Sequence, residues 1–439
     1  MLKNYFRQKL KKLVKQYFVA HPEVKLIAIA GSVSKTTTKH AVSTILSQRY
    51  RVGGALDDRN YDPEISVPFG ILGLKIPEKL SSFSDWRKVF KAAKTRVKQP
   101  ATVDVIVQDF SIAKPGDMAN FGTYLSPDIT ILTAITPEHM EFFGNMETVA
   151  SEEAMAVNFA KAAFVNRDDV NGNYARYISN QAIMTYGATQ IAENRIEVSG
   201  FSTETGFTGR FVGTRVPQGF DLAVRVFGEQ VLRAVTVAIA IGLEFGMSVL
   251  EIQEALKKVS PVLGRMNVLR GRKNSLLIDD TYTSSPAAVR EALRALYRFP
   301  ISAEGYKIAV LGSMNQLGAL SAEAHREIGG LCDPSQLEWV VTVGQEANQY
   351  LAPVARARGC QVKSFATALE AGGFVNKVLR PGSVVLFNGS QDGIYLEEAA
   401  KLVLASAVDY DKLIRQSLDW QKTKGNFFAT QMNLTEGDD

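Results

Sequence analysis

The first clear pattern in the chain is an apolar run at Val24–Ala30, which ends at Gly31. Apolar residues then recur at helical spacing from Ser34 to about Gln48, so these residues predict a strand, a loop and a helix in succession. Further apolar, β-rich runs follow, with an acidic helix between two of them. Strands that alternate with helices are typical of a parallel sheet covered on both faces. The runs are 103–109, 128–133, 161–166 and 183–187, and the acidic helix is 146–160.

The pattern changes at residues 195–227, which are β-rich and interrupted by five glycines, as expected of hairpins at a sheet edge. Two helices are predicted next, and then Pro261–Arg265 is typical of a hinge. From Leu276 the alternation restarts, which predicts a second, doubly wound domain with a boundary near 265–272. The later strands are predicted at 275–280, 306–312, 338–343 and 383–388, and the helices at 229–246, 248–258, 286–298, 321–331, 345–358 and 394–405.

Composition narrows the class of protein. A chain of 439 residues is too long for one ordinary domain, and its 46% hydrophobic and 22% charged residues are typical of soluble globular proteins. Its two cysteines, Cys332 and Cys360, provide neither a disulfide framework nor a metal-ligand spacing, which fits a reducing compartment. No apolar run reaches the ~20 residues needed to cross a bilayer, and no signal peptide is recognisable. We therefore expect a cytoplasmic protein.

Positive charge is concentrated at the N-terminus. Residues 1–20 hold six bases and no acid, and their apolar positions recur at helical spacing, so residues 1–24 predict a basic amphipathic helix. Such a helix either lies on an anionic membrane surface or packs on its own domain with its lysines in water. A net charge of +5 without a DNA- or RNA-binding motif gives no reason to expect a nucleic-acid partner. The polar residues 431–439 predict a flexible tail. The apolar positions of the helix are Leu2, Phe6, Leu10, Leu13 and Tyr17.

A phosphate-binding loop is predicted where the first strand ends and the helix begins, the context that such a motif requires. Backbone N–H groups would hold phosphate oxygens, Lys35 would reach the β- and γ-phosphates, and the Thr36 hydroxyl would face Mg²⁺. The other interpretation is a helix cap with an exposed lysine. The usual motif has glycine before the lysine, where this chain has Ser34, so weakened ATP binding is expected. The predicted ATP-binding loop is Gly31, Ser32, Val33, Ser34, Lys35, Thr36 and Thr37.

Several segments, in order, resemble the Mur ligase family, most closely the branch that adds D-Ala-D-Ala to the peptidoglycan precursor peptide. The resemblance spans residues 25–405, and its specificity lies in the order and spacing of the segments. The segments are Gly31–Thr38, Asn60–Pro68, Val107–Asp109 with Pro115–Met118, Thr136–Glu141 with Phe143 and Gly144, Gly264 and Arg265, Asp279–Tyr282 with Ser285 and Pro286, Val310–Met314 with Leu317, Gly318 and His325, and Asn388–Ser390.

The resemblance implies an α/β fold in two domains. A central P-loop ATPase-like, ATP-binding domain with a mostly parallel sheet is expected at 25–267, and a Rossmann-like, doubly wound C-terminal domain at 268–430. It also implies a ligase that uses ATP to phosphorylate a carboxylate, after which an amine attacks the acyl phosphate and an amide forms. The expected cofactors are ATP and Mg²⁺, and the expected partners are a small-molecule or precursor-peptide substrate and an amino acid or dipeptide amine. A monomer is the family's usual state.

The family's motifs also assign roles in the phosphate site. Lys35, Asp109 and His139 are expected to be catalytic, Lys35 as the phosphate cation and the other two by holding Mg²⁺ together with Thr36. Glu153 lies where many relatives carry a lysine whose amine is carbamylated, and we hypothesise that its carboxylate replaces that carbamate in positioning magnesium. The other interpretations are a structural loop histidine for His139 and a solvated acid for Glu153.

Three residues are expected to contact the nucleotide from the hinge and the C-terminal domain. Arg265 resembles the family's hinge arginine, and Asp280 and Tyr282 lie in the segment that begins its C-terminal domain. Closure of the domains would expel water from the acyl phosphate. The alternatives are a hinge salt bridge, a capping acid and a packed aromatic ring, respectively.

Several family positions are changed in this chain, so either the site has adapted or catalysis is impaired. The second possibility gives the alternative function, a nucleotide-binding relative with a regulatory or scaffolding role. The phosphate loop already begins at Gly31, so we expect the family's N-terminal uridine-binding domain to be missing. Residues 54–100, with Trp86, either contact an anionic or lipid-linked substrate in its place or form a helix docked on the core. The changed positions are Ser34, Asp109, Glu229, Gln230, Arg233, Thr283 and Asn388.

Overall fold

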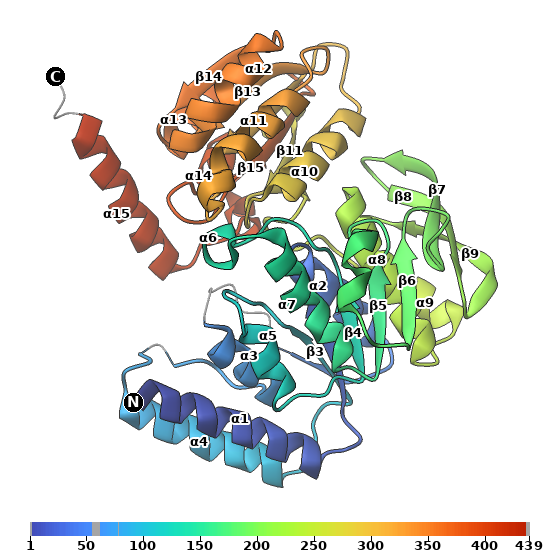
Figure 1. Ribbon diagram of the computed structural model, residues 1–439. Helices are drawn as coiled ribbons and strands as arrows, with labels where there is room; N and C mark the ends of the chain where they lie inside the picture. Colours follow the sequence, from blue (N-terminus) through green and yellow to red (C-terminus); the bar gives the residue numbers. More distant parts are fainter. Residues whose placement is uncertain (1, 55–61, 78, 436–439) are drawn as a thin grey trace. The chain divides into compact units, whose positions relative to one another are not determined.

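The computed structural model describes residues 2–54, 62–77 and 79–435, which form two compact units (Figure 1). The motif residues Asn60 and Tyr61 lie outside the described residues. In sequence the main division falls between Val259 and Ser260, slightly before the predicted boundary, and the N-terminal helix belongs to unit 1. Unit 1 comprises Met1–Phe201, Phe207–Arg225 and Leu232–Val259, and unit 2 comprises Ser202–Gly206, Val226–Val231 and Ser260–Asp439.

Unit 1 is built on the predicted, mostly parallel sheet. The strand order is β2-β3-β1-β4-β5-β6-β7-β8-β9, and the pairs from β2 to β7 are parallel, whereas β8 and β9 form an antiparallel pair at the edge. The expectation of a parallel sheet with edge hairpins is confirmed. The strands are β1 (Lys25–Ala30), β2 (Val52–Gly53), β3 (Val105–Asp109), β4 (Ile129–Leu132), β5 (Ala162–Asn166), β6 (Ile183–Gly187), β7 (Asn194–Ser202), β8 (Gly206–Gly213) and β9 (Val216–Val224).

Several helices of this part of the chain begin at a residue whose side chain caps the helix. The Asn145 side chain accepts a hydrogen bond from Thr148 N–H at the start of α7, and Ser248 and Glu251 form a capping box at the start of α9. The helices are α1 (Leu2–Ala20), α2 (Lys35–Leu46), α3 (Pro63–Leu72), α4 (Phe83–Lys98), α5 (Asp117–Gly122), α6 (Met140–Phe143), α7 (Met146–Asn158), α8 (Glu229–Glu244) and α9 (Val249–Leu256).

Helix α1 buries its apolar face within unit 1. Phe6, Leu10 and Leu13 are buried, and the Phe6 ring stacks on Trp86 of α4 with ring centroids 4.5 Å apart. The buried apolar face of α1 is therefore not available to insert into lipid. Helix α1 packs on its own domain through this face, and the segment with Trp86 forms a helix docked on it. Among the described helices, none combines the length and the apolar character that a bilayer crossing needs.

Unit 2 contains the predicted doubly wound sheet. Its order is β10-β11-β15-β12-β13-β14, with only the β10–β11 pair antiparallel. One face packs against α13 and α14, where Leu277, Val310 and Phe387 are buried. The strands are β10 (Asn267–Arg270), β11 (Leu276–Asp280), β12 (Lys307–Gly312), β13 (Leu337–Val343), β14 (Val362–Phe365) and β15 (Val384–Asn388). The helices are α10 (Pro286–Arg298), α11 (Ser321–Leu331), α12 (Ala352–Ala357), α13 (Ala368–Val378), α14 (Glu397–Val403) and α15 (Leu418–Thr435).

Three details of unit 2 differ from the predicted elements. The predicted helix 345–358 is a π-helical turn at Ala347–Leu351 followed by α12. The sequence patterns did not indicate β10, β14, α13 or α15. Helix α15 runs to Thr435, into the segment predicted as a flexible tail, and residues 436–439 lie outside the described part of the chain.

Candidate active site

The loop after β1 is shaped by close contacts with the end of β4. Gly31 has φ +120°, and a Cβ there would lie 2.2 Å from Thr133 Oγ1, so only glycine fits. Ser32 N–H donates to the Ala134 carbonyl at 2.9 Å, and Thr136 N–H donates to Ser32 Oγ at 3.0 Å. These contacts fix the loop at the carboxyl end of the parallel strands, the edge at which ligands bind in open α/β sheets.

Lys35 is held inside the loop. Its Nζ donates to the carbonyl oxygens of Gly31 at 2.5 Å and Ser32 at 3.4 Å, and it lies 3.5 Å from a Glu138 carboxylate oxygen. The lysine side chain is only 13% exposed, so the alternative of a helix cap with an exposed lysine does not describe this loop. The residue before it, Ser34, has φ +66° and ψ +6°, a left-handed conformation that glycine adopts without strain.

Glu153 of α7 is part of the loop structure. Its buried carboxylate accepts a hydrogen bond from Gly31 N–H at 2.6 Å. Burial raises the pKa of Glu153 to about 7; the positive charge of Lys35 opposes this shift, while the negative charge of Glu138 adds to it. The alternative of a solvated acid is wrong, because α7 packs the side chain against the phosphate loop.

Asp109 ends β3 and is ion-paired. Lys39, a buried residue of α2, places its Nζ 2.9 Å from an Asp109 carboxylate oxygen, and the Gln108 side-chain amide donates to the same oxygen at 3.0 Å. Burial alone would raise the pKa of Asp109, but the charges of Lys39 and Lys35 and these hydrogen bonds hold it below its usual value. Asp109 is therefore ionised beside the loop, the state that a magnesium ligand needs.

His139 follows β4 and reaches the same group of charges through Glu138. His139 Nε2 lies 3.7 Å from Glu138, the carboxylate that also faces Lys35. The residue has φ +50° and precedes α6. Glu138 was not among the predicted site residues, although it stands beside His139 in the motif segment and its carboxylate was a visible signal.

The four predicted magnesium ligands do not form a closed cluster. Within residues 2–54, 62–77 and 79–435, no three His, Cys, Asp or Glu side chains are grouped closely enough to hold a metal ion. The positive charge of Lys35 nevertheless acts to lower the pKa of both Asp109 and Glu153, and Thr36 lies beside Lys35 in the first turn of α2. Carboxylate and hydroxyl oxygens suit a hard cation, so the donor chemistry fits Mg²⁺.

In unit 2 the three predicted nucleotide contacts lie together around the end of β11. The Arg265 guanidinium stacks 4.3 Å from the centre of the Tyr282 ring, and Tyr282 N–H donates to the Gly264 carbonyl at 2.9 Å. Asp280 accepts a hydrogen bond from Met266 N–H at 3.1 Å. Burial raises the pKa of Asp280, and the charge of Arg265 opposes this shift. The sequence motifs therefore placed three residues at one point of the fold.

The change of the family's lysine to Asn388 is matched by a contact. The Asn388 side-chain amide donates to Asp280 at 2.7 Å, and the Ser284 hydroxyl donates to the Asn388 amide oxygen at 2.7 Å. Asn388 is buried and ends β15, the neighbour of β11. An amide can serve both partners here, which supports an adapted site.

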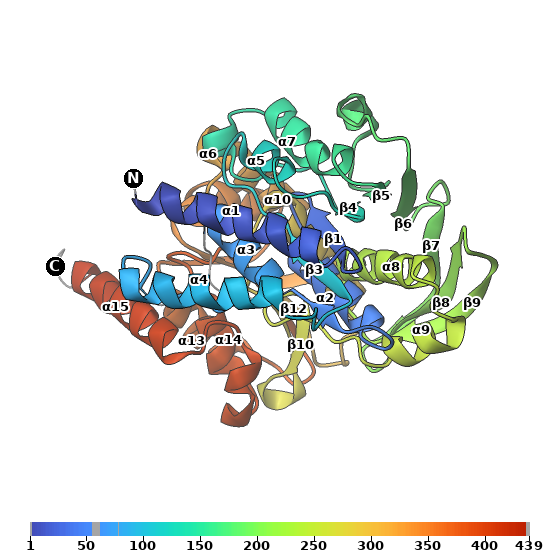
Figure 2. The same ribbon diagram turned by 90° about the horizontal axis from the view of Figure 1, so that it is seen from below.

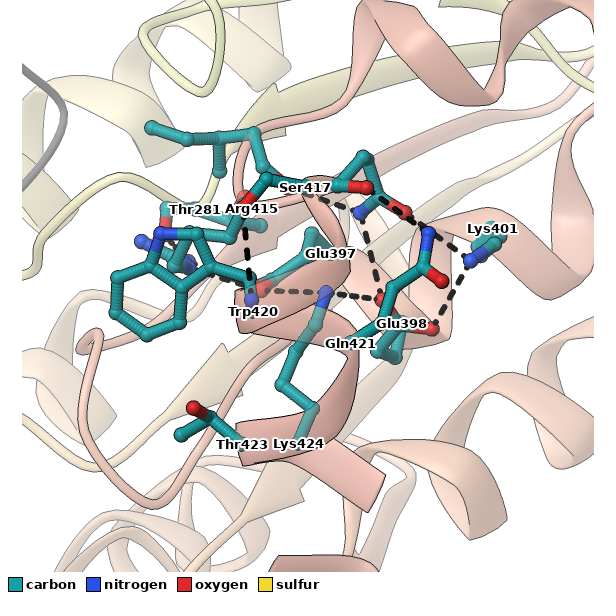
Figure 3. Close-up of polar contacts among 12 residues, drawn as sticks. Thr281, Glu397, Glu398, Lys401, Arg415, Ser417, Trp420, Gln421, Thr423 and Lys424 are labelled. Carbon is teal, nitrogen blue, oxygen red and sulfur yellow. Dashed lines mark hydrogen bonds and ion pairs between the residues drawn. The ribbon is translucent and has the colours of Figure 1, made fainter. Parts of the chain in front are cut away.

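Sequence reasoning missed the residues that hold this segment in place. Arg415 donates from Nη1 to the Tyr282 carbonyl at 3.1 Å and from Nη2 to the Thr281 carbonyl at 2.6 Å (Figure 3). Its Nε and Nη2 also bind both carboxylate oxygens of Glu397, at 2.8 and 2.7 Å. Lys424 of α15 lies 3.4 Å from Glu397 and also pairs with Glu398. No motif indicated this ion-pair network, because its members lie in three separate parts of the chain.

Comparison with known proteins identifies the family. The family model for the Mur ligase middle domain matches residues 29–242, and the model for the Mur ligase glutamate ligase domain matches residues 264–391. The UDP-N-acetylmuramoyl-tripeptide–D-alanyl-D-alanine ligase of Bacillus subtilis is 24% identical over 416 residues, covering 90% of this chain and 79% of that protein. The enzyme of the same name from Treponema pallidum is 26% identical over 390 residues, covering 87% and 75%.

The fold agrees with these matches. The crystal structure of MurF ligase from Thermotoga maritima in complex with ADP has a TM-score of 0.72 at 21% identity, covering 90% of this chain and 83% of that chain. The matched domains and the loop around Lys35 define an ATP-dependent ligase. Together the two matched segments extend over most of the sequence. The chain belongs to the Mur ligase family.

Proposed function

We propose that the chain joins the carboxylate of a peptidoglycan-precursor peptide to a D-alanyl-D-alanine-like amine, with conversion of ATP to ADP and phosphate. The observation that carries this proposal is the buried loop in which Lys35 lies among the carboxylates of Glu138, Glu153 and Asp109, in a unit matched by the Mur ligase middle domain. The Bacillus subtilis and Treponema pallidum relatives support the substrate pair, since both are named for it.

The proposed reaction has two steps. A substrate carboxylate oxygen attacks the γ-phosphorus of ATP, the bond to the β-phosphate oxygen breaks, and ADP leaves. The amine then attacks the acyl carbon, phosphate leaves with the bonding electrons, and the amine proton passes to solvent or phosphate. Lys35 and the loop N–H groups would stabilise the charge on the transferring phosphoryl oxygens, which is the main task of a phosphoryl-transfer site.

Thr36, Asp109, His139 and Glu153 are the residues that would hold Mg²⁺. Mg²⁺ supplies positive charge that neutralises the phosphate oxygens during transfer. The support for Glu153 is its buried carboxylate beside the loop, at the position where the sequence resemblance leads us to expect a carbamylated lysine. Arg265, Asp280 and Tyr282 are the proposed nucleotide-binding residues of unit 2. A cytoplasmic location and a monomeric state remain predictions.

The alternative of an impaired, regulatory relative is not favoured. The changed residues Asp109 and Asn388 each have a matched partner, respectively Lys39 and Asp280. Among the changed residues, Ser34 has a strained backbone conformation that glycine would relieve. An adapted site accounts for these contacts, in which each changed side chain meets a partner of matching charge or hydrogen-bonding capacity.

Purified protein with Mg²⁺, ATP, UDP-N-acetylmuramoyl-tripeptide and D-alanyl-D-alanine tests the proposal. We expect ADP release that requires both substrates, and a product whose mass equals the two substrates less one water. The Lys35→Met variant is the control for contaminating activity. Binding of ADP without turnover on this pair or on related amines would favour the regulatory alternative. No binding of adenine nucleotide at millimolar concentration would reject the phosphate site itself.

A further inference from the structure

Two helices of unit 1 form one strongly basic surface. Helices α1 and α4 lie side by side along their length (Figures 1 and 2). They run in the same direction, because Phe6 near the start of α1 meets Phe83 at the start of α4, while His21 after α1 contacts the Arg96 carbonyl near the end of α4. We name the exposed bases of the two helices the basic face: Lys12, Lys15, Arg87, Lys88, Lys91, Lys94 and Lys98.

The apolar packing explains why these bases point outward. Phe6, Trp86 and Phe90 stack on one another between the helices, with ring centroids 4.5 to 5.7 Å apart. Leu10 and Ala93 are also buried. Because a helix has 3.6 residues per turn, burying one stripe leaves the opposite stripe in water. The basic face is that opposite stripe on both helices.

Acidic side chains of the described residues neutralise little of the charge on this surface. Residues 2–20 and 83–98 contain twelve bases and one acid, Asp85, whereas the whole chain has a net charge of +5, so the rest of the chain is net acidic. Asp85 is paired with Lys88 at 3.2 Å. Arg7 and Lys11 turn inward, to Glu64 at 2.8 and 3.0 Å. The segregation of charge is therefore a property of these two helices.

Exposed aromatic side chains lie at one end of the same surface. Tyr5 is 54% exposed and Phe83 is 64% exposed, and both are at the N-terminal end of the helix pair. Aromatic rings beside lysines are typical of proteins that bind at the membrane–water interface, where the ring enters the headgroup region and the lysine pairs with anionic lipid.

We propose that the basic face binds an anionic lipid membrane, with Tyr5 and Phe83 at its edge. The contact is electrostatic and differs from insertion of an amphipathic helix, since the apolar face of α1 is buried. A membrane is favoured over nucleic acid, because six of the seven exposed bases are lysines, whereas arginine is the residue suited to bidentate recognition of phosphates and bases. Each lysine near an anionic surface strengthens binding about fivefold, or about 1 kcal/mol.

The test is co-sedimentation of the full chain with vesicles of equal parts phosphatidylglycerol and phosphatidylcholine, compared with phosphatidylcholine alone. We expect binding to the anionic vesicles only, lost as salt shortens the Debye length from about 10 Å at 0.1 M to about 3 Å at 1 M. The triple variant Lys91→Gln, Lys94→Gln, Lys98→Gln should bind about 100-fold more weakly. Phe83→Ser should weaken binding severalfold at low salt.

The matched control is Lys363→Gln, Lys377→Gln, Lys422→Gln, which removes the same charge from exposed positions of unit 2. It should bind like the unchanged chain. All substituted side chains are exposed, so circular dichroism should be unchanged. Equal binding to both vesicle types, or equal losses in the two triple variants, would overturn the proposal. Duplex DNA or single-stranded RNA that binds through Lys91, Lys94 and Lys98 while anionic vesicles do not would replace the membrane by nucleic acid.

Discussion

Ser34 holds a backbone conformation that costs a non-glycine residue free energy. With φ +66° and ψ +6° it lies in the left-handed region, where the Cβ approaches the backbone carbonyl. The strain costs about 1–2 kcal/mol. Replacement by glycine removes it but gives the unfolded chain more freedom, worth about 0.5–1 kcal/mol. We therefore expect Ser34→Gly to stabilise unit 1 by about 0.5–1 kcal/mol, which corresponds to a rise in Tm of about 1–3 °C.

The strain affects nucleotide binding only in a different case. If the empty loop leaves the left-handed conformation and the bound loop requires it, Ser34→Gly leaves Tm unchanged and the Kd for ADP falls by about two- to fivefold. Differential scanning calorimetry measures the first effect and isothermal titration calorimetry the second.

Two variants separate strain from other effects of the substitution. Ser34→Ala removes the hydroxyl but keeps the strain, so it should show no gain in Tm. Ser47→Gly places glycine at the other end of α2, where φ is −64°, and should lower stability by about 0.5–1 kcal/mol. The reasoning is refuted if Ser34→Gly lowers Tm as Ser47→Gly does, because the left-handed conformation would then carry no cost.

Four further predictions follow from the described contacts. Lys35→Met should lower kcat/KM by more than about 100-fold through loss of phosphate stabilisation, with an unchanged circular dichroism spectrum; a rate near that of the unchanged chain would remove Lys35 from the site. Glu153→Gln should raise the magnesium concentration needed for half-maximal rate. In the unchanged chain this magnesium concentration should fall as pH rises through about 7, because the pKa of Glu153 is raised to about 7 and only the ionised carboxylate attracts the cation. Identical magnesium titrations of the variant and the unchanged chain would contradict this role. Burial raises the pKa of Asp279 from 3.8 to about 7. Its contribution to the stability of unit 2 is therefore fully present below about pH 4 and is lost as pH rises through about 7, a change on the order of 2–4 kcal/mol. Thermal melts of Asp279→Asn over the same pH range should not show this loss. Arg415→Gln should destabilise unit 2 by about 3–5 kcal/mol, because the buried Glu397 loses its bidentate partner. The double variant Arg415→Gln, Glu397→Gln should lose less stability than the two single variants added together. Additive losses would show that the pair is not coupled.

The elements that sequence patterns missed have a physical explanation in unit 2. Helix α13 contains Gly372 and Gly373, residues that predict a break in a helix. In the fold, a Cβ on Gly372 would lie 2.8 Å from Ala399 Cα, so glycine permits the close packing of α13 on α14. A glycine that predicts a loop from the sequence is therefore needed here for the packing of two helices. That packing depends on Ala399, which is distant from Gly372 in the sequence.

The sequence by itself determined the alternation of strands and helices, the position of the phosphate loop and the glycine-like conformation at Ser34, since each depends on local periodicity, hydrogen bonding or φ and ψ preference. Only the tertiary structure decided that Glu153 accepts a hydrogen bond from Gly31, that α1 buries its apolar face against α4, and that Arg415 donates a hydrogen bond to the Thr281 carbonyl. Burial and ion pairing join residues that lie far apart along the chain, so no local pattern records which charge meets which.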